Sequence, residues 1–291
     1  MRKIRLALIQ QPVPERNPEE NLEKTIVLIE SAAKNKARII CLQELFLSRY
    51  FPREEKKSFF RLAEKIPGPT TSVLQKVAKI NGTVLIVPLF EKRASGLYHN
   101  SAVVIDADGK LLGVYRKMHI PHDPYFREKY YFSPGDRGFK TFKTAFGVIG
   151  VLICWDQWFP EAARLTALAG AEIIFYPTAI GFQSGETKAA VNKQIRAWKT
   201  IQVAHAIANG IFVASVNRVG REKNLSFWGH SFVAAPDGSI IARAGSSRGK
   251  ILVADCDLRL IGHTREEWPF LRDRRIDAYK PLSKLYSGNS A

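Results

Sequence analysis

The 291-residue sequence predicts an α/β fold in which two mixed sheets pack together and helices cover their outer faces. One observation is the alternation of strand-like and helix-like segments over the first 90 residues. Another is a change to hairpins, because an Asp108-Gly109 turn joins two apolar runs within 101–117. A third is the lack of a Pro/Ser-rich linker, a low-complexity tract or an internal repeat. We therefore expect one domain over 1–291.

The first half of the chain supplies three predicted strands and two predicted helices. The strands are apolar runs at 2–10, 38–44 and 83–90. The helices lie at 17–37 and 71–82. Asn17 is placed to cap the first helix, Pro18 suits its first turn, and Glu20 completes a capping pattern. The second helix ends in an Asn-Gly turn.

The second half mixes hairpins with helices. Hairpins are predicted at 101–117 and 139–154. Helices are predicted at 160–171 and 186–210. Further strands are predicted within 172–177, 211–220, 231–245 and 250–258. Residues 259–291 form a polar, basic and aromatic tail.

The formal net charge of +17 is the unusual bulk property. A nucleic-acid-binding protein would fit this charge. However, Lys and Arg are scattered, and the densest stretches, REEKK and RDRRID, contain acids. We therefore favour a solvated basic surface, with a basic nucleic-acid-binding protein kept as the alternative from another class.

The three cysteines have no framework or metal-ligand spacing, which indicates free thiols in a reducing compartment. The short apolar run near the N-terminus does not resemble a signal peptide. No segment reaches the ~18 consecutive apolar residues of a membrane helix. We expect a cytoplasmic protein with no membrane association.

Three predicted strands end on residues able to do chemistry, namely Glu44, Lys117 and Cys154. Neighbouring strands lie about 5 Å apart, and ligands favour the carboxyl ends of strands in open α/β sheets. If these strands are neighbours in a sheet and run in the same direction, the three side chains can meet in one pocket. Taken singly, Cys154 suits a core position, Glu44 a solvated strand end and Lys117 a surface charge. The occurrence of all three residues at the ends of apolar strands favours a shared functional site.

A thiol, a carboxylate and an ammonium form a coherent catalytic set. Glu44 can take the thiol proton of Cys154, since the thiolate is the better nucleophile. Lys117 favours the thiolate and can stabilise an oxyanion, and the backbone amide of Trp155 is a second candidate donor.

The other two cysteines are predicted to be unreactive. Cys41 lies inside an apolar strand. Cys256 lies between Asp255 and Asp257, whose charges would raise the pKa of its thiol.

The segments LQELF, YRKMHIP and ICWDQWFPE resemble the three signature segments of the nitrilase superfamily of carbon–nitrogen hydrolases. The resemblance covers nearly the whole chain. It implies a four-layer α-β-β-α sandwich and a Glu-Lys-Cys triad at Glu44, Lys117 and Cys154. It also implies a homo-oligomer, a dimer or larger, and we expect residues 259–291 to take part in its contacts.

The resemblance also points to a second acid near the triad. The corresponding segment is FREKYYFSPGD, in which Glu128 is the candidate. A solvated loop acid beside Arg127 and Lys129 is the alternative. We favour an active-site role.

Longer segments resemble one branch of the superfamily, the N-carbamoylputrescine amidases. They are HIPHDPYFREKYYFSPGDRGFKTF, AHAIANGIFVASVNRVG, FWGHSFVA and WPFLRDRRIDAY. The branch implies hydrolysis of N-carbamoylputrescine to putrescine, ammonia and carbon dioxide in polyamine synthesis. An amidase or carbamoylase acting on another small linear amide is the alternative within the superfamily.

A substrate with a cationic tail would be bound by acidic side chains and aromatic faces. The candidate substrate-binding residues are Tyr50, Asp123, Trp155 and Glu186. Carbamoylases of amino acids need an Arg for the carboxylate, whereas this chain has Gln157 and Trp158 just beyond Cys154.

No cofactor is expected. His119, His122 and Asp123 are close in sequence, but a proline interrupts them and no further ligand is evident, so we expect no metal. Glycine-rich nucleotide motifs are absent from the sequence.

Overall fold

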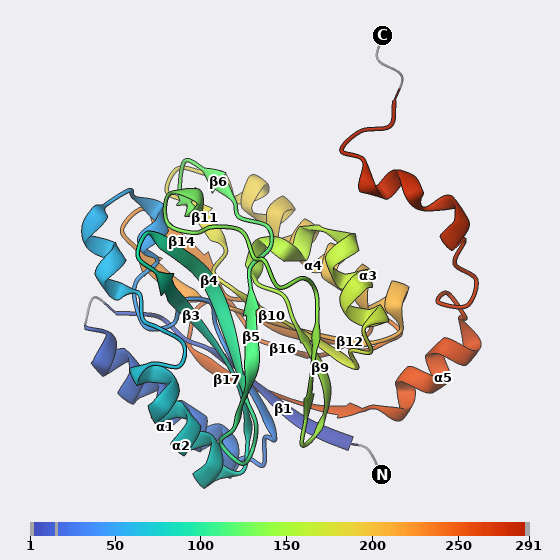
Figure 1. The fold of residues 1–291 in the computed structure, drawn as a ribbon, viewed down its shortest axis with the longest axis horizontal. Helices are drawn as coiled ribbons and strands as arrows, with labels where there is room; N and C mark the ends of the chain where they lie inside the picture. The colour runs from blue at the N-terminus through green and yellow to red at the C-terminus, as the bar shows by residue number, and fades with distance from the viewer. Residues whose placement is uncertain (1–2, 15–16, 289–291) are drawn as a thin grey trace.

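A computed structural model describes residues 3–14 and 17–288 and confirms the predicted α/β sandwich (Figure 1). In this part of the chain, two six-stranded mixed sheets form the centre. The first sheet has the order β17 (Lys250–Asp257), β1 (Lys3–Gln10), β2 (Ile39–Leu42), β3 (Val84–Ala94), β4 (Leu97–Ile105) and β5 (Leu111–Arg116). The second has the order β16 (Ile240–Arg243), β15 (Phe232–Ala234), β12 (Phe212–Asn217), β10 (Ile173–Thr178), β9 (Gly147–Val151) and β8 (Thr141–Thr144).

Helices cover the two outer faces, as Figure 1 shows. The α-helices are α1 (Pro18–Lys34), α2 (Pro69–Asn81), α3 (Pro160–Leu168), α4 (Lys188–Asn209) and α5 (Arg259–Glu267). The pair α1 and α2 packs on the first sheet, and α3 and α4 pack on the second. The predicted cap of α1 is confirmed, because Asn17 Oδ1 accepts a hydrogen bond from the backbone N–H of Glu20 at 2.9 Å.

Alternate residues of β1 face different layers, as the period of a strand requires. Leu6 and Leu8 are buried in the core that also contains strands of the second sheet. Ala7 and Ile9 instead pack with apolar residues of α1 and α2. The strand is therefore apolar on both faces, which explains its continuous apolar sequence.

Smaller elements extend the sandwich at one end. A three-stranded sheet has the order β11 (Gly181–Gln183), β14 (Leu225–Trp228) and β13 (Val219–Glu222), and β6 (His122–Asp123) pairs with β7 (Phe126–Arg127). The 3₁₀ turns are η1 (Phe51–Arg53), η2 (Lys57–Leu62), η3 (Glu128–Tyr130), η4 (Cys154–Trp158), η5 (Ile276–Ala278) and η6 (Lys280–Ser283). The sequence pattern did not predict β11, β14 or the helix α5 within the tail.

The expected neighbour relation among the three site strands is wrong. Strands β2 and β5 belong to one sheet but are separated by β3 and β4, while β9 belongs to the other sheet. The pattern could not reveal this, because apolar runs report burial and not pairing. The strand ends also differ, since β2 ends at Leu42 and β9 at Val151. Glu44 and Cys154 thus lie in the turns beyond the strands.

Within the described ranges, no helix has both the length and the apolar character that crossing a membrane requires.

Gly150 of β9 packs directly against Thr166 of α3. A Cβ at Gly150 would lie 2.2 Å from Thr166 Cγ2, whereas a Cβ at Gly245 would meet nothing within 4 Å. We predict that Gly150→Ala lowers the free energy of unfolding by about 1–3 kcal/mol through overpacking. Urea denaturation measures this effect, with Gly245→Ala as the control. Equal unfolding midpoints for the two variants would contradict the packing described.

Candidate active site

Lys117 lies immediately after β5, with its ammonium group buried between two carboxylates. Its Nζ donates to Glu44 Oε1 at 2.8 Å and to Glu128 Oε2 at 2.7 Å, and all three side chains are 0% exposed. Burial acts to lower the pKa of Lys117, but the charges of Glu128 and Glu44 outweigh it and hold that pKa above its ordinary value. Lys117 is therefore a permanent buried cation.

Glu44 is fixed through one carboxylate oxygen and through its backbone. Its Oε1 also accepts from Asn100 Nδ2 at 2.8 Å, while Oε2 is buried without a hydrogen-bond partner among the described residues. Arg218 Nη2 donates to the carbonyls of Glu44 and Leu45 at 3.1 and 2.8 Å. Arg218 is held in turn by an ion pair with Glu222 at 2.6 Å. One oxygen of a rigid carboxylate thus remains available to take a proton.

Cys154 opens the turn η4 and has a positive φ of 45°. Few residues other than glycine adopt this conformation, and such strain often marks a functional site. Glu44, Lys117 and Glu128 all act electrostatically on the thiol, so side chains that are far apart in the sequence converge here. Because Glu44 and Lys117 are buried and converge on the thiol, the alternatives of a solvated strand end and a surface charge are disfavoured.

The thiol of Cys154 is neutral at rest. Burial raises its pKa well above the ordinary value, and Glu44 adds to this effect. Lys117 and a hydrogen bond from the backbone of Ala179 act in the opposite direction but do not prevail. Lys117 does lower the pKa of the thiol, as expected, but burial and Glu44 raise this pKa by more. A base is needed to form the nucleophile.

Glu128 lies in η3 and is buried rather than solvated. Its Oε1 accepts a hydrogen bond from the hydroxyl group of Tyr50 at 2.6 Å. Burial raises the pKa of Glu128 to about 7, with Glu44 adding and Lys117 opposing. Tyr50 is itself completely buried, so this hydrogen bond is shielded from solvent.

A cavity of about 510 Å³ lies over Cys154. It is lined by Pro121, Asp123, Phe126, Cys154, Trp155, Trp158, Ile180, Gly181, Ala190, Lys193, Gln194, Ala197 and Trp228. Two of the candidate substrate-binding residues, Asp123 and Trp155, are on this wall. Most of the lining residues are apolar or aromatic and a few are polar, as in many small-molecule sites.

The other two candidates, Tyr50 and Glu186, are absent from the cavity wall. Glu186 accepts hydrogen bonds from the backbone of Gln183 at 2.8 Å and from the side chain of Gln194. Its contact with the cavity is therefore indirect, through Gln194. A role of Tyr50 and Glu186 in binding the substrate therefore stays a prediction, and in this structure it would be indirect, through Glu128 and Gln194.

Asn100 of β4 reaches Glu44 and had no sequence signal. Arg218, which follows β12 and also reaches Glu44, and Trp228, which joins the cavity from β14, lie in segments that resemble the amidase branch, but no role was predicted for them. Trp158 lies in the same signature segment as Cys154.

The described side chains give no sign of a metal centre, and the other two cysteines are unreactive. Among residues 3–14 and 17–288, no group of three His, Cys, Asp or Glu side chains is placed to hold a metal ion. Burial raises the pKa of Cys41, and it raises that of Cys256 to about 12, with Asp255 adding. Burial, rather than the two flanking carboxylates, is thus the main cause at Cys256.

Comparison with known proteins gives a consistent result. The chain matches the carbon-nitrogen hydrolase family over residues 5–266. An N-carbamoylputrescine amidase of Solanum lycopersicum is 45% identical over 90% of this chain and 89% of that protein. A citrullinase of Francisella tularensis is 40% identical over 98% of this chain and 100% of that protein.

A solved structure supports the same assignment. The crystal structure of a carbon-nitrogen hydrolase from Helicobacter pylori G27 superimposes with a TM-score of 0.95 and 45% identity, covering 98% of this chain and 100% of that one. Sequence, fold and the buried Lys117 cluster agree, and the chain belongs to the carbon-nitrogen hydrolase family of the nitrilase superfamily, as a hydrolase of carbon–nitrogen bonds other than peptide bonds.

Proposed function

We propose that the protein hydrolyses N-carbamoylputrescine to putrescine, ammonia and carbon dioxide through a covalent intermediate on Cys154. The observation that carries this proposal is that Cys154 lines an aromatic cavity while its thiol interacts with Glu44, Lys117 and Glu128. Several plant relatives with the name N-carbamoylputrescine amidase support the choice of substrate. Membership in a hydrolase family favours this function over nucleic-acid binding.

Catalysis begins with proton transfer from the Cys154 thiol to Glu44, whose Oε2 accepts no hydrogen bond from the part of the chain that the structure describes. The thiolate then adds to the ureido carbon, and the carbonyl electron pair moves to oxygen. Lys117 and the backbone amide of Trp155 stabilise the resulting oxyanion. Because Lys117 is already an ammonium ion, it stabilises this charge without giving up its proton.

The tetrahedral intermediate collapses and expels a nitrogen leaving group, which takes its proton from Glu44. An S-carbamoyl intermediate remains on Cys154. Glu44 then accepts a proton from water as the water attacks this carbon, and that proton passes to the departing sulfur to regenerate the thiol. The released carbamic acid breaks down to carbon dioxide and the second nitrogen product. Glu128 orients the substrate NH₂ group or the Lys117 ammonium.

The cationic tail of the substrate is assigned to the cavity wall. Asp123 supplies a carboxylate there, and Trp155 supplies an aromatic face. Tyr50 acts through its hydrogen bond to Glu128. Glu186 acts through Gln194, which it holds at the cavity.

A second candidate substrate is a ureido amino acid such as citrulline. Lys193 lines the same cavity as Asp123, and an ammonium with a carboxylate suits a zwitterionic tail. The related citrullinase of Francisella tularensis supports this alternative.

The described cysteines are all unpaired, which fits the cytoplasmic location that we propose.

A panel of substrates with a nucleophile variant tests the assignment. We predict the highest kcat/KM for N-carbamoylputrescine among N-carbamoyl amines, N-carbamoyl amino acids, ω-amides and nitriles, measured by ammonia release. Cys154→Ala should lower kcat by more than about 10³-fold while the protein stays folded, because the covalent route is lost. Cys256→Ala is the control and should remain active.

The outcomes of this panel separate the candidates. A preference for citrulline would replace the proposed substrate with the second one. Wild-type ammonia release by Cys154→Ala would contradict the covalent mechanism itself.

The raised pKa of Glu128 predicts a pH dependence. Its carboxylate, which accepts from both Lys117 and Tyr50, forms as the pH rises through about 7. We expect kcat/KM to rise over this range and to level off above it. In Glu128→Gln, which cannot ionise, activity should be lower and this limb absent. An identical acid limb in the variant would show that another group titrates.

The same shift has a consequence for stability. Between about pH 4.5 and 7, the folded state holds a proton on Glu128 that the unfolded state has lost. The contribution of Glu128 to stability therefore falls as the pH rises through this range.

We also propose that residues 1–291 form a single domain. Within it, residues 259–291 form a tail that contacts a second copy of the chain. The start of this tail is anchored, since Ile261 of α5 is buried and Arg265 Nε donates to the carbonyl of Asn209 at 3.2 Å. Beyond α5 the tail leaves the sandwich (Figure 1). Residues 289–291 lie outside the described part.

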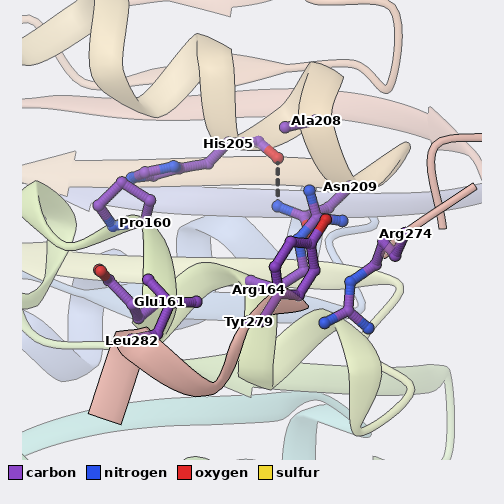
Figure 2. Close-up of a pocket in the computed structure, with 9 residues that line it drawn as sticks. All are labelled: Pro160, Glu161, Arg164, His205, Ala208, Asn209, Arg274, Tyr279 and Leu282. Atoms are coloured by element: carbon purple, nitrogen blue, oxygen red, sulfur yellow. Dashed lines mark hydrogen bonds between the residues drawn. The ribbon is translucent and has the colours of Figure 1, made fainter. Parts of the chain in front are cut away.

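The described tail exposes large apolar side chains. They include Trp268, Phe270, Ile276, Tyr279, Leu282, Leu285 and Tyr286. A pocket of about 260 Å³ lies between α3, the end of α4 and the tail, to which Arg274, Tyr279 and Leu282 contribute. Figure 2 shows the residues that line it. Apolar exposure on this scale is typical of an association surface.

Deletion of residues 269–291 tests the tail proposal. We expect the full chain to be a dimer or larger in light scattering after gel filtration, and the truncated chain to have a smaller mass. A truncated chain that keeps the oligomeric mass of the full chain would contradict it.

A further inference from the structure

We infer that Asp156 is a positioning residue that holds the turn of Cys154 against the segment carrying Lys117. This inference rests on the catalytic roles proposed above for Cys154 and Lys117. It assigns no contact with substrate to Asp156, which is completely buried and absent from the cavity wall.

The carboxylate of Asp156 accepts four hydrogen bonds. Its Oδ1 accepts from the backbone N–H of His119 at 3.0 Å and from the ring Nδ1 of His119 at 2.7 Å. Its Oδ2 accepts from the hydroxyl group of Tyr115 at 2.7 Å and from the backbone N–H of Ile153 at 2.9 Å. Each oxygen therefore serves one backbone N–H and one side chain.

These partners surround the two groups that must meet. Tyr115 and His119 lie two residues before and two residues after Lys117, and Ile153 directly precedes Cys154. Lys117 follows β5 of the first sheet, whereas Cys154 follows β9 of the second. One buried carboxylate thus fixes the end of one sheet relative to the end of the other, beside the site.

The turn of Cys154 needs such a restraint. Its φ of 45° lies in the left-handed region, where a non-glycine residue is strained and persists only if its surroundings determine it. The backbone N–H of Asp156 also donates to the carbonyl of Ile153 at 3.1 Å, so two hydrogen bonds close the turn from opposite directions. Asp156 therefore stabilises the conformation that presents the thiol.

His119 completes the arrangement from the partly exposed side. Its ring is stacked on Phe159, with centroids 3.7 Å apart and planes 5° from parallel. Phe159 follows η4, and this stacking joins the same two segments a second time. A proton on Nδ1 allows the ring to donate to Asp156.

Asp156→Asn is the informative change because it preserves size. An amide has one acceptor oxygen, while the two carboxylate oxygens each receive a backbone N–H, from His119 and from Ile153. In either orientation one backbone N–H faces the NH₂ group. The tautomer of His119 or rotation of the Tyr115 hydroxyl cannot relieve this conflict.

We expect Asp156→Asn to lower kcat by about 10²-fold with KM changed less than about threefold, because reacting groups are misplaced while the cavity is kept. We also expect alkylation of Cys154 by iodoacetamide, followed by peptide mass spectrometry, to slow by about tenfold, since Glu44 no longer reaches the thiol. Asp237→Asn is the control, because its carboxylate bonds only to Ser239 on an exposed turn and should leave both rates unchanged.

Milder variants keep the test decisive if Asp156→Asn does not fold. Tyr115→Phe removes one donor and should lower kcat about fivefold. His119→Leu should impair the enzyme, and His119→Asn, which retains a donor near the position of Nδ1, should restore part of the loss. Effects of Tyr115→Phe and His119→Leu confined to thermal stability would overturn the inference, since a purely structural role predicts that pattern.

The two readouts separate this inference from the proposed function. If Asp156→Asn alkylates and turns over at wild-type rates or faster, the positioning role is wrong while the function stands. If the wild-type protein hydrolyses no ureido substrate but the alkylation rates differ as expected, the function is wrong while the positioning role stands.

Discussion

The candidate site depends on one buried cation. A charged Lys117 inside the protein is stable only because Glu44 and Glu128 bind it at 2.8 and 2.7 Å. Three charges in one dry volume require further polar partners, and Asn100 and Tyr50 supply them. Loss of Lys117 would leave Glu44 and Glu128 buried without their cation. Catalytic chemistry and local stability therefore use the same hydrogen bonds.

The sandwich explains how this cluster comes to lie beside a thiol. Lys117 and Glu44 follow strands of the first sheet, while Cys154 follows a strand of the second. Packing of the two sheets brings their ends together, and Asp156 then fixes the fine geometry between them. Burial keeps the thiol of Cys154 neutral, so the site carries no extra anion before a base takes the proton, which is the role proposed for Glu44.

Much of this was predictable from the sequence, and the failures have physical reasons. Apolar runs indicated the strands. The chemically active residues that follow three of these runs, Glu44, Lys117 and Cys154, were therefore predicted to form a site. Strand order was not predictable, because pairing depends on contacts between distant segments. For the same reason Asn100 gave no signal. The sequence could not show that Tyr50 is buried and bonded to Glu128 rather than part of the cavity wall, since aromatic residues suit core and cavity equally.

The central claim is that the buried Lys117 cluster and Cys154 act on one carbonyl group. A crystal structure of Cys154→Ala soaked with N-carbamoylputrescine tests it most directly. The account predicts a ureido oxygen within hydrogen-bond distance of Lys117 Nζ, with the ureido carbon facing position 154 and the amine tail in the aromatic cavity. A fully occupied substrate whose carbonyl group makes no contact with Lys117 would contradict it.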